Sequence, residues 1–388
     1  MAYLRPSLLS RPSQVRMRIF SHIDIPLITC AVMISLLGLI TMNSFASENA
    51  FFERQVIWLA ISIGVFIIAS QIDYRFLRRT WPVALLFAVS VVSLALVYVF
   101  GDIVKGAQSR FNLGVFAIQP SDPAKLILVI LLAKYFARRH IEIKHIRHIL
   151  VSGLYAAILF FLILLQPDFG SAIIIAAIWF GVVLVAGISR KHLIAVLLTG
   201  LIVSGGLWSF VLADYQKQRV LTFLNPLSDI QGSGYNAYQA TVAVGSGQLF
   251  GKGIGYGTQS KLKFLPEYET DFIFAAFAEE WGFAGVALLF LLFGIVIWRI
   301  LAHASQGGSN FEALFAIGLA VFLTSHFVIH VGINLGLLPV TGTTIPFMSY
   351  GGSHLLTEFL GLGILNGMRR YGRTARRTEE ERELLGIM

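Results

Sequence analysis

The sequence predicts an all-α polytopic membrane protein, on the strength of three observations. Apolar residues make up 56% of the 388 positions, only 13% are charged, and the mean hydropathy is +0.75. Charged residues account for about a quarter of an ordinary soluble domain, so half the usual number is missing. Apolar runs recur along the chain at the length of about 20 residues that crosses a bilayer. A soluble enzyme could not bury this much apolar surface, and a disordered chain would be rich in charge.

Ten apolar segments are predicted to cross the membrane as helices. In chain order they are residues 24–42, 55–70, 81–100, 123–137, 149–165, 171–188, 192–212, 272–299, 311–332 and 353–368. The second and fourth segments are short, so flanking residues or a local adjustment of the bilayer must complete them. The seventh segment contains Gly200, Gly205 and Gly206, which makes it the least rigid of the predicted spans.

The distribution of basic residues orients these spans. An even number of spans places both termini on one side, and that side carries 21 of the 30 Lys and Arg residues, whereas the opposite side carries eight. The positive-inside rule then makes both termini cytoplasmic. We expect a tail of residues 1–23, a single membrane domain of residues 24–370 with a long loop of residues 213–271, and a tail of residues 371–388. The net charge of +9 reflects this topology and not nucleic-acid binding.

Four groups of polar motifs stand out, and the order of the spans places all of them on the outer side. They are residues 105–125, 166–170, 251–272 and 339–353. The third group lies in the 59-residue loop 213–271, which we expect to be a partly folded cap, because loops of this length are usually functional or disordered. Unrelated motifs would scatter over both faces, so their convergence indicates one extracytoplasmic site.

The outer side of a cell membrane offers no ATP, so a reaction there needs a substrate that carries its own leaving group. Lipid-linked pyrophosphate sugars meet that requirement. Glycosyl transfer from such a donor needs one base for the acceptor hydroxyl and positive charge for the departing pyrophosphate. A divalent cation could supply that charge, and no nucleotide cofactor is expected. The cysteine and histidine spacing predicts no metal cluster.

Asp271 is the candidate general base. It lies where the polar loop meets the apolar segment 272–299, so it is partly desolvated and can reach a lipid head group. A helix N-cap is the alternative role, and the two are compatible. Arg110 and Lys105, on an outer loop, are the candidates for binding the pyrophosphate, although a solvated surface charge is the preferred interpretation of Lys105.

Four other carboxylates at or inside the predicted spans have candidate roles. Asp122 and Lys125 have the i, i+3 spacing of an ion pair, and a structural pair is favoured over contact of Lys125 with a pyrophosphate. Glu279 and Glu280 lie two turns into their span, where helix-packing hydrogen bonds are the favoured explanation. Asp168 precedes a span and suits a helix N-terminus.

Taken together, the motifs resemble the SEDS family, the RodA/FtsW group of peptidoglycan glycosyltransferases, over roughly residues 20–370. The stretches that carry the likeness are Gly106-Ala107, Gln119-Pro-Ser, Ala124-Lys125-Leu126, Gln166-Pro-Asp168, Asn225-Pro226, Gly234-Tyr235, Gly251-Lys252-Gly253, Gly257-Thr-Gln-Ser260, Leu265-Pro-Glu267, Thr270-Asp-Phe-Ile-Phe274 and Pro346-Phe-Met-Ser-Tyr-Gly-Gly-Ser353. The stretch at 257–260 is more similar to the elongation branch, RodA, than to the division branch, FtsW.

The resemblance implies a ten-helix SEDS fold in the bacterial cytoplasmic membrane that polymerises lipid II into glycan strands and releases undecaprenyl pyrophosphate. It also implies a class B penicillin-binding protein as the transpeptidase partner. Asp271 matches the essential carboxylate of the family, and Asp122, Lys125 and Glu267 fall in motifs that we assign to substrate binding together with Arg110 and Lys105.

The sequence departs from the family pattern at three positions. Ser109-Arg110-Phe111 stands where Arg-Trp is usual, Asp122 replaces the usual Glu, and Glu269 stands where His is common. These changes concern contacts to the head group and leave Asp271 unaffected.

Two other classes of function compete with the enzyme. A lipid II flippase would use a groove along the glycine-rich span 192–212, but a transporter places its charged groups near the midplane, between repeats. A scaffold that only recruits the synthase would leave Asp271 dispensable.

Overall fold

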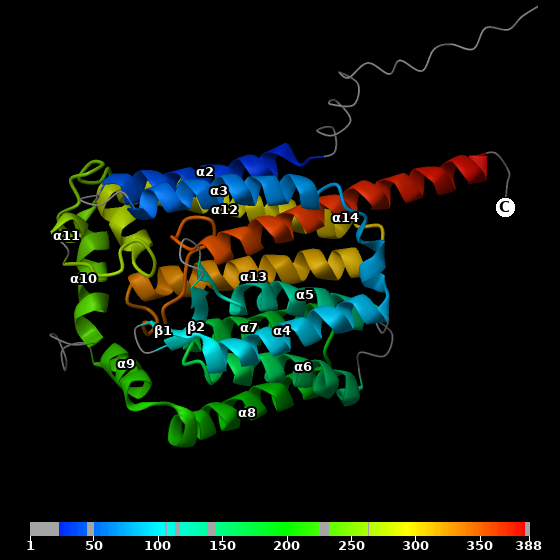
Figure 1. Ribbon diagram of the computed structural model, residues 1–388, viewed down its shortest axis with the longest axis horizontal. Helices are drawn as coiled ribbons and strands as arrows, with labels where there is room; N and C mark the ends of the chain where they lie inside the picture. The colour runs from blue at the N-terminus through cyan, green and yellow to red at the C-terminus, as the bar shows by residue number, and fades with distance from the viewer. Residues whose placement is uncertain are drawn as a thin grey trace, which may run out of the picture.

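The computed structural model describes residues 23–44, 50–104, 107–112, 117–137, 145–225, 233–262 and 264–384, which form a bundle of long, nearly aligned helices (Figure 1). A helix occupies each of the ten predicted positions. These helices are α2 (Ile25–Ser44), α3 (Ala50–Ala69), α4 (Thr80–Phe100), α5 (Ser121–Ala137), α6 (Ile146–Leu164), α7 (Phe169–Ala186), α8 (Arg190–Gly206), α12 (Ile273–Gln306), α13 (Asn310–Asn334) and α14 (Gly352–Leu384). Within the described residues, eight helices are long and apolar enough to span a membrane, which confirms the polytopic prediction. The remaining two of the ten are α5, with 17 residues, and α14.

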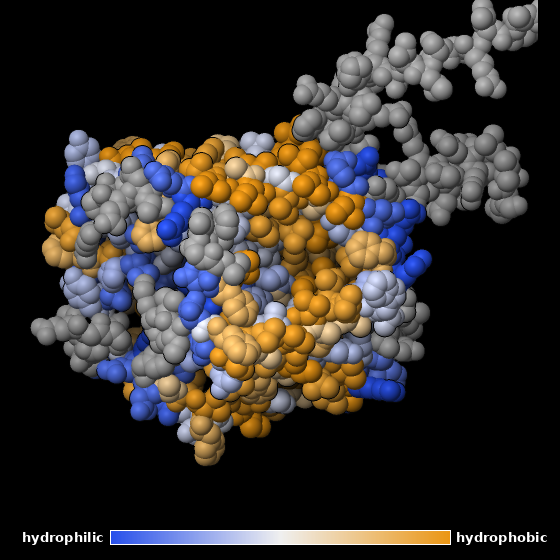
Figure 2. Space-filling view, viewed as in Figure 1, coloured by the Kyte–Doolittle hydropathy of each residue, from blue (hydrophilic) through white to orange (hydrophobic). Residues whose placement is uncertain are grey.

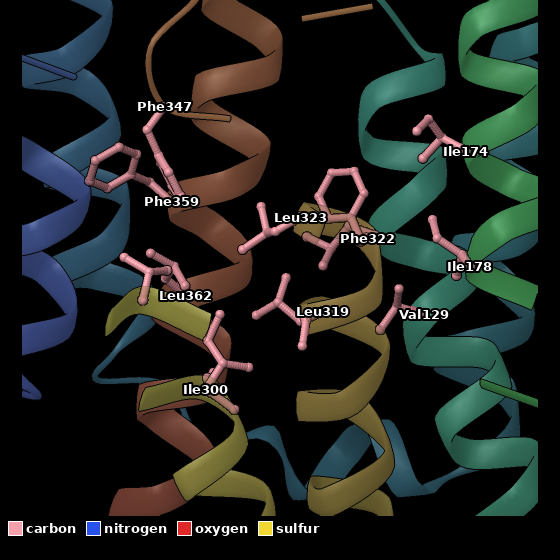
Figure 3. Packing of buried hydrophobic residues seen from close by; sticks show 14 of the residues in the cluster. Val129, Ile174, Ile178, Ile300, Leu319, Phe322, Leu323, Phe347, Phe359 and Leu362 are labelled. Atoms are coloured by element: carbon pink, nitrogen blue, oxygen red, sulfur yellow. The ribbon is translucent and has the colours of Figure 1, made fainter. Parts of the chain in front are cut away.

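Helix α13 lies at the centre of the bundle and packs against α5, α7 and α12. Figure 3 shows three of its side chains, Leu319, Phe322 and Leu323, between Val129 of α5 on one side and Leu362 of α14 on the other. Lipid tails are as apolar as these side chains, so close packing and not the hydrophobic effect holds such helices together.

One face of the molecule is divided into three zones. Figure 2 shows a broad hydrophobic band with hydrophilic residues gathered at both ends. One end carries the continuation of α14 toward the C-terminus, and the other carries the short helices and strands that connect the long helices (Figure 1). The band is the part that lipid covers, and we refer to the end with the short helices and strands as the cap end.

Two features, one at each end of α4, were not predicted. A small antiparallel sheet, in the order β1-β2-β3, joins α4 to α5. Its strands are β1 (Asp102–Val104), β2 (Ala107–Asn112) and β3 (Ala117–Ile118), with Asp102 opposite Arg110. At the far end of α4, a short 3-10 helix, η1 (Tyr74–Arg78), connects α3 to α4.

The predicted long loop is partly structured. It contains α9 (Asp214–Leu224), α10 (Ser233–Ser246) and α11 (Thr258–Lys261). Helix α10 packs against α12 and α13, where Ala240 and Ala243 are buried beside Phe272 in a second apolar cluster. The loop is therefore anchored beside the N-terminus of α12, and Asp271 lies directly before that terminus.

Helix α8 differs from the other long helices because none of its residues is buried. It continues into a short π-helix, η2 (Leu207–Val211), before the loop begins. This is the span that the sequence analysis predicts to be the least rigid, because it contains three glycines.

Candidate functional site

Asp271 lies immediately outside the N-terminus of α12. The N-cap of that helix is Phe272, whose side chain makes no capping hydrogen bond, so the structure does not give Asp271 the N-cap position that its sequence context allowed. The residue is partly exposed, whereas the nine residues that follow it are all buried. Its carboxylate faces Gly342, because a Cβ built on that glycine would lie 3.5 Å from Oδ2 of Asp271. Asp271 is thus a partly exposed carboxylate at the N-terminal end of a helix whose first residues are buried.

A tight turn precedes this carboxylate at the cap end. The carbonyl of Glu267 accepts hydrogen bonds from the N–H groups of Thr270 and Phe272, both at 3.1 Å. Glu267 itself has φ 54° and is partly exposed, and Thr270 Oγ1 lies 3.4 Å from Glu267 Oε2. Burial and the charge of Glu269 raise the pKa of Tyr268 to about 12, so its hydroxyl stays protonated at neutral pH.

The motif at 346–353 connects this turn to the interior of the bundle. At one end, Ser349 Oγ donates to the carbonyl of Thr270 at 2.9 Å, and the N–H of Tyr350 donates to the carbonyl of Glu269 at 2.8 Å. At the other end, Ser353 Oγ donates to Asp122 Oδ2 at 2.7 Å. One segment therefore holds both the turn before Asp271 and the predicted ion pair.

Asp122 and Lys125 do form that ion pair, with Nζ and Oδ1 3.1 Å apart and side chains that are only 7% and 2% exposed. The pair belongs to a larger buried cluster that the sequence analysis missed. His354 Nδ1 lies 3.5 Å from Asp122, and His354 Nε2 lies 2.9 Å from Glu358. Ionisable residues spaced i, i+4 inside the span 353–368 were the available signal, since such residues are rare and significant in membrane helices. Contact of Lys125 or Asp122 with substrate stays a prediction.

The carboxylates Glu279 and Glu280 attach the long loop to α12. Glu279 accepts hydrogen bonds from Lys252 Nζ at 2.7 Å and Thr258 Oγ1 at 3.0 Å. Glu280 Oε1 accepts from the N–H of Gly255 and from Ser44 Oγ of α2, both at 2.6 Å. Helix packing explains only the contact with Ser44. The glycine-rich motifs at 251–260 serve to bind these two carboxylates.

Helix α12 is interrupted at Gly282, whose φ of 64° and ψ of −166° are not helical. A break inside a membrane protein leaves backbone groups without partners unless neighbouring protein satisfies them. Segment 248–253 does so: its N–H groups donate to the carbonyls of Glu279 and Glu280, and its carbonyls accept from Phe283 and Ala284, at 2.9 to 3.0 Å. The break produces a short half-helix, residues 273–281, which is buried except for the partly exposed Trp281 and has Asp271 just before it.

Three of the predicted residues remain. Arg110 is exposed on β2 at the cap end (Figure 1), and its contact with a pyrophosphate stays a prediction. Lys105 falls outside the described residues. Asp168 caps α7 by accepting from the N–H of Ser171 at 3.0 Å, which confirms its predicted helix-terminal role, and it also accepts from Gln119 Nε2. Among the residues that the structure describes, no group of three His, Cys, Asp or Glu side chains could hold a metal ion.

The fold and the site define an integral-membrane protein. Its multi-pass bundle has a partly exposed carboxylate at the N-terminal end of a half-helix. The family model of FtsW, RodA and SpoVE, described as cell cycle protein, matches residues 15–374. The chain belongs to this family, which confirms the family resemblance seen in the motifs.

Individual relatives agree with this assignment. Peptidoglycan glycosyltransferase MrdB of Escherichia coli K12 is 35% identical over 332 residues, covering 84% of this chain and 88% of that protein. A probable peptidoglycan glycosyltransferase FtsW of Thioalkalivibrio sp. K90mix is 34% identical over 383 residues, covering 90% of each. Similar identities to both branches leave the branch open.

Solved structures share the fold. A protein of a peptidoglycan synthase complex that coordinates polymerization and crosslinking superimposes with a TM-score of 0.77 at 31% identity, covering 90% of this chain and 98% of that one. The rod shape determining protein RodA of Thermus thermophilus gives a TM-score of 0.69 at 30% identity, with the same coverage. The predicted SEDS fold is therefore confirmed.

Proposed function

We propose that this protein polymerises lipid II into the glycan strands of peptidoglycan during cell elongation, with Asp271 as the general base. Its family and its relatives make it a peptidoglycan glycosyltransferase. The observation that supports Asp271 most directly is its placement. It is a partly exposed carboxylate directly before a half-helix whose residues 273–280 are all buried, and the side chains of Asn334 and Ser349 hold the backbone carbonyls of Asp271 and Thr270.

The chemistry requires one proton transfer and one displacement. Asp271 removes the proton from a sugar hydroxyl of the acceptor lipid II, and that oxygen attacks the anomeric carbon of the lipid-linked chain. The bond between this carbon and the pyrophosphate oxygen breaks with inversion, and undecaprenyl pyrophosphate departs as an anion. No second carboxylic acid is needed, because the leaving group is already ionised.

Positive charge on the outer side stabilises the departing anion. Arg110, exposed on β2, is the described side chain best suited to that task, and a divalent cation could assist it. Glu267, Lys105, Asp122 and Lys125 complete the proposed binding residues. Of these, Asp122 and Lys125 act from within the bundle through the segment 346–353.

The proposed setting follows from charge and from the relatives. Both termini lie in the cytoplasm of a bacterium and the cap end faces outward, as the distribution of basic residues requires. The similarity to a subunit of a complex that couples polymerization to crosslinking supports a transpeptidase partner, a class B penicillin-binding protein. The Gly257-Thr-Gln-Ser260 motif favours the elongation role over division.

The test is polymerisation of labelled lipid II by the purified protein together with its transpeptidase partner. We expect glycan polymer from the wild type and a loss of at least about 100-fold from Asp271→Asn, as for removal of a general base. Asp214→Asn, which neutralises an exposed carboxylate of the same loop, is the matched control and should polymerise normally.

Equal polymer from wild type and Asp271→Asn would refute the assignment of the base. An absence of polymer from the wild type, together with movement of lipid II across liposomes, would instead identify a flippase.

A further inference from the structure

We propose that Asn334, the last residue of α13, positions Asp271 for catalysis by fixing the N-terminus of the half-helix that follows Asp271. This inference rests on Asp271 being the general base. Asn334 lies 63 positions from Asp271 in the sequence, and its side chain is fully buried.

The side chain of Asn334 makes three hydrogen bonds. Its Nδ2 donates to the carbonyl of Asp271 at 3.0 Å and to the carbonyl of His330 at 2.8 Å. Its Oδ1 accepts from the N–H of Ala275 at 3.1 Å. Two carbonyl partners and one N–H partner leave a single orientation of the amide in which all three bonds form, so the side chain is locked.

These bonds replace a cap that the local sequence does not provide. A helix begins with backbone N–H groups that have no partner within the helix, and a side chain at the N-cap usually accepts from one of them. The N-cap here is Phe272, which has no acceptor. Asn334 supplies the acceptor for Ala275 from the neighbouring helix, and with its other end it holds the backbone of Asp271 itself.

A local cap would fix only the direction of the helix. A cap provided by α13 also fixes where the helix begins relative to the rest of the bundle. The residues that follow Asn334 lead to Gly342, the residue that the Asp271 carboxylate faces. The C-terminal end of α13 therefore positions both Asp271 and Gly342. A carboxylate that must meet a lipid-bound hydroxyl benefits from this, because misplacement by about 1 Å can cost about 100-fold in rate.

The consequence is a defined kinetic signature. Asn334 touches the backbone of Asp271 and no outer surface, so its loss should leave binding of lipid II unchanged and slow the chemical step. We expect Asn334→Ala to lower kcat by about 10- to 100-fold and to change KM by less than about twofold.

A second variant tests the hydrogen bond to Asp271 separately from the cap. Asn334→Asp keeps an acceptor for the N–H of Ala275 and removes both donors, in nearly the same volume. It should lose as much kcat as Asn334→Ala. If Asn334→Ala does not purify as a folded protein, Asn334→Ser takes its place, since a hydroxyl has a single hydrogen and cannot donate to both carbonyls.

The chain offers a matched control. Asn366 is buried in α14, and its Oδ1 accepts from the N–H of Asp24, which precedes α2 at the other end of the bundle. Asn366→Ala therefore removes the same kind of contact far from Asp271. It should retain kcat within about twofold of wild type.

The experiment measures kcat and KM for labelled lipid II with the complex of protein and transpeptidase, and the thermal stability of each variant in detergent. Retention of wild-type kcat by Asn334→Asp would overturn the proposal, and so would an equal loss from Asn366→Ala. Failure of the general base is distinguishable, because Asp271→Asn would then remain active whatever the Asn334 variants do.

Discussion

The contact between Gly282 and Gly251 gives the sharpest prediction about stability. Gly282 has φ 64° and ψ −166°, a region open almost exclusively to glycine. A Cβ placed on Gly282 would meet the backbone N–H of Gly251 and lie 2.7 Å from the carbonyl carbon of Phe250. The neighbours are backbone atoms and not flexible side-chain ends, so the substitution Gly282→Ala must displace segment 248–253.

The cost follows from what the displacement breaks. The backbone conformation alone costs about 1 to 3 kcal/mol in a residue with a Cβ. Four backbone hydrogen bonds link segment 248–253 to residues 279–284, and each contributes about 0.5 to 1.5 kcal/mol. We therefore expect Gly282→Ala to lower the free energy of unfolding by at least about 3 kcal/mol, a large part of the total for a typical protein.

Gly294 on the same helix is the control, because a Cβ there would meet nothing within 4 Å. Gly294→Ala should be neutral or stabilise the helix by up to about 1 kcal/mol. Unfolding in increasing dodecyl sulfate compares the two variants, and limited trypsin digestion reports whether Lys252 is released from Glu279. Equal midpoints and equal protection of Lys252 would refute the argument.

Two further predictions concern opposite ends of the molecule. Gly342→Ala places a residue with a Cβ at φ 73°, and that Cβ lies 3.5 Å from Oδ2 of Asp271. Polymerisation of lipid II should therefore fall by about 10-fold at unchanged protein yield. Undiminished activity would contradict the placement of Asp271 against Gly342. Asp24 is buried at the start of α2; burial alone would raise its pKa, but hydrogen bonds and charges from His303 and Arg299 outweigh that effect and hold the pKa well below 3.8. A lowered pKa means that the ion pairs stabilise the fold at neutral pH and that this contribution disappears as the pH falls below about 4. Asp24→Asn should thus lower the free energy of unfolding by about 3 kcal/mol at pH 7 and by less at pH 3, as measured by thermal unfolding. An equal difference from wild type at both pH values would contradict the role of these ion pairs.

The long helices could be predicted because apolar run length decides them. A run of about 20 apolar residues has few alternatives to a membrane helix, and a helix occupies every predicted position. Helix ends were less predictable, because polar residues continue a helix beyond the hydrocarbon without a change in hydropathy. Helix α14 shows this by running to Leu384, well past the predicted residue 368.

The site was only partly predictable, for a different reason. Asp271 could be found because it is a carboxylate at a boundary between polar and apolar sequence. The break at Gly282 could not, since one glycine in an apolar run says nothing about its φ. Its conformation depends on segment 248–253, about 30 residues away, and the role of Asn334 depends on a partner even more distant in sequence.

The two halves of α12 are subject to different constraints. Residues 273–280 are buried throughout, and they contact α13 through Asn334 and the long loop through Glu279 and Glu280. Beyond Gly282 the helix turns exposed apolar side chains such as Leu291 and Trp298 toward lipid. The cap-end loop and α13, and not the lipid-facing half, therefore determine where Asp271 lies. We accordingly expect the glycine-rich motifs of the loop to affect catalysis through the proposed base Asp271, because they hold the half-helix that follows it.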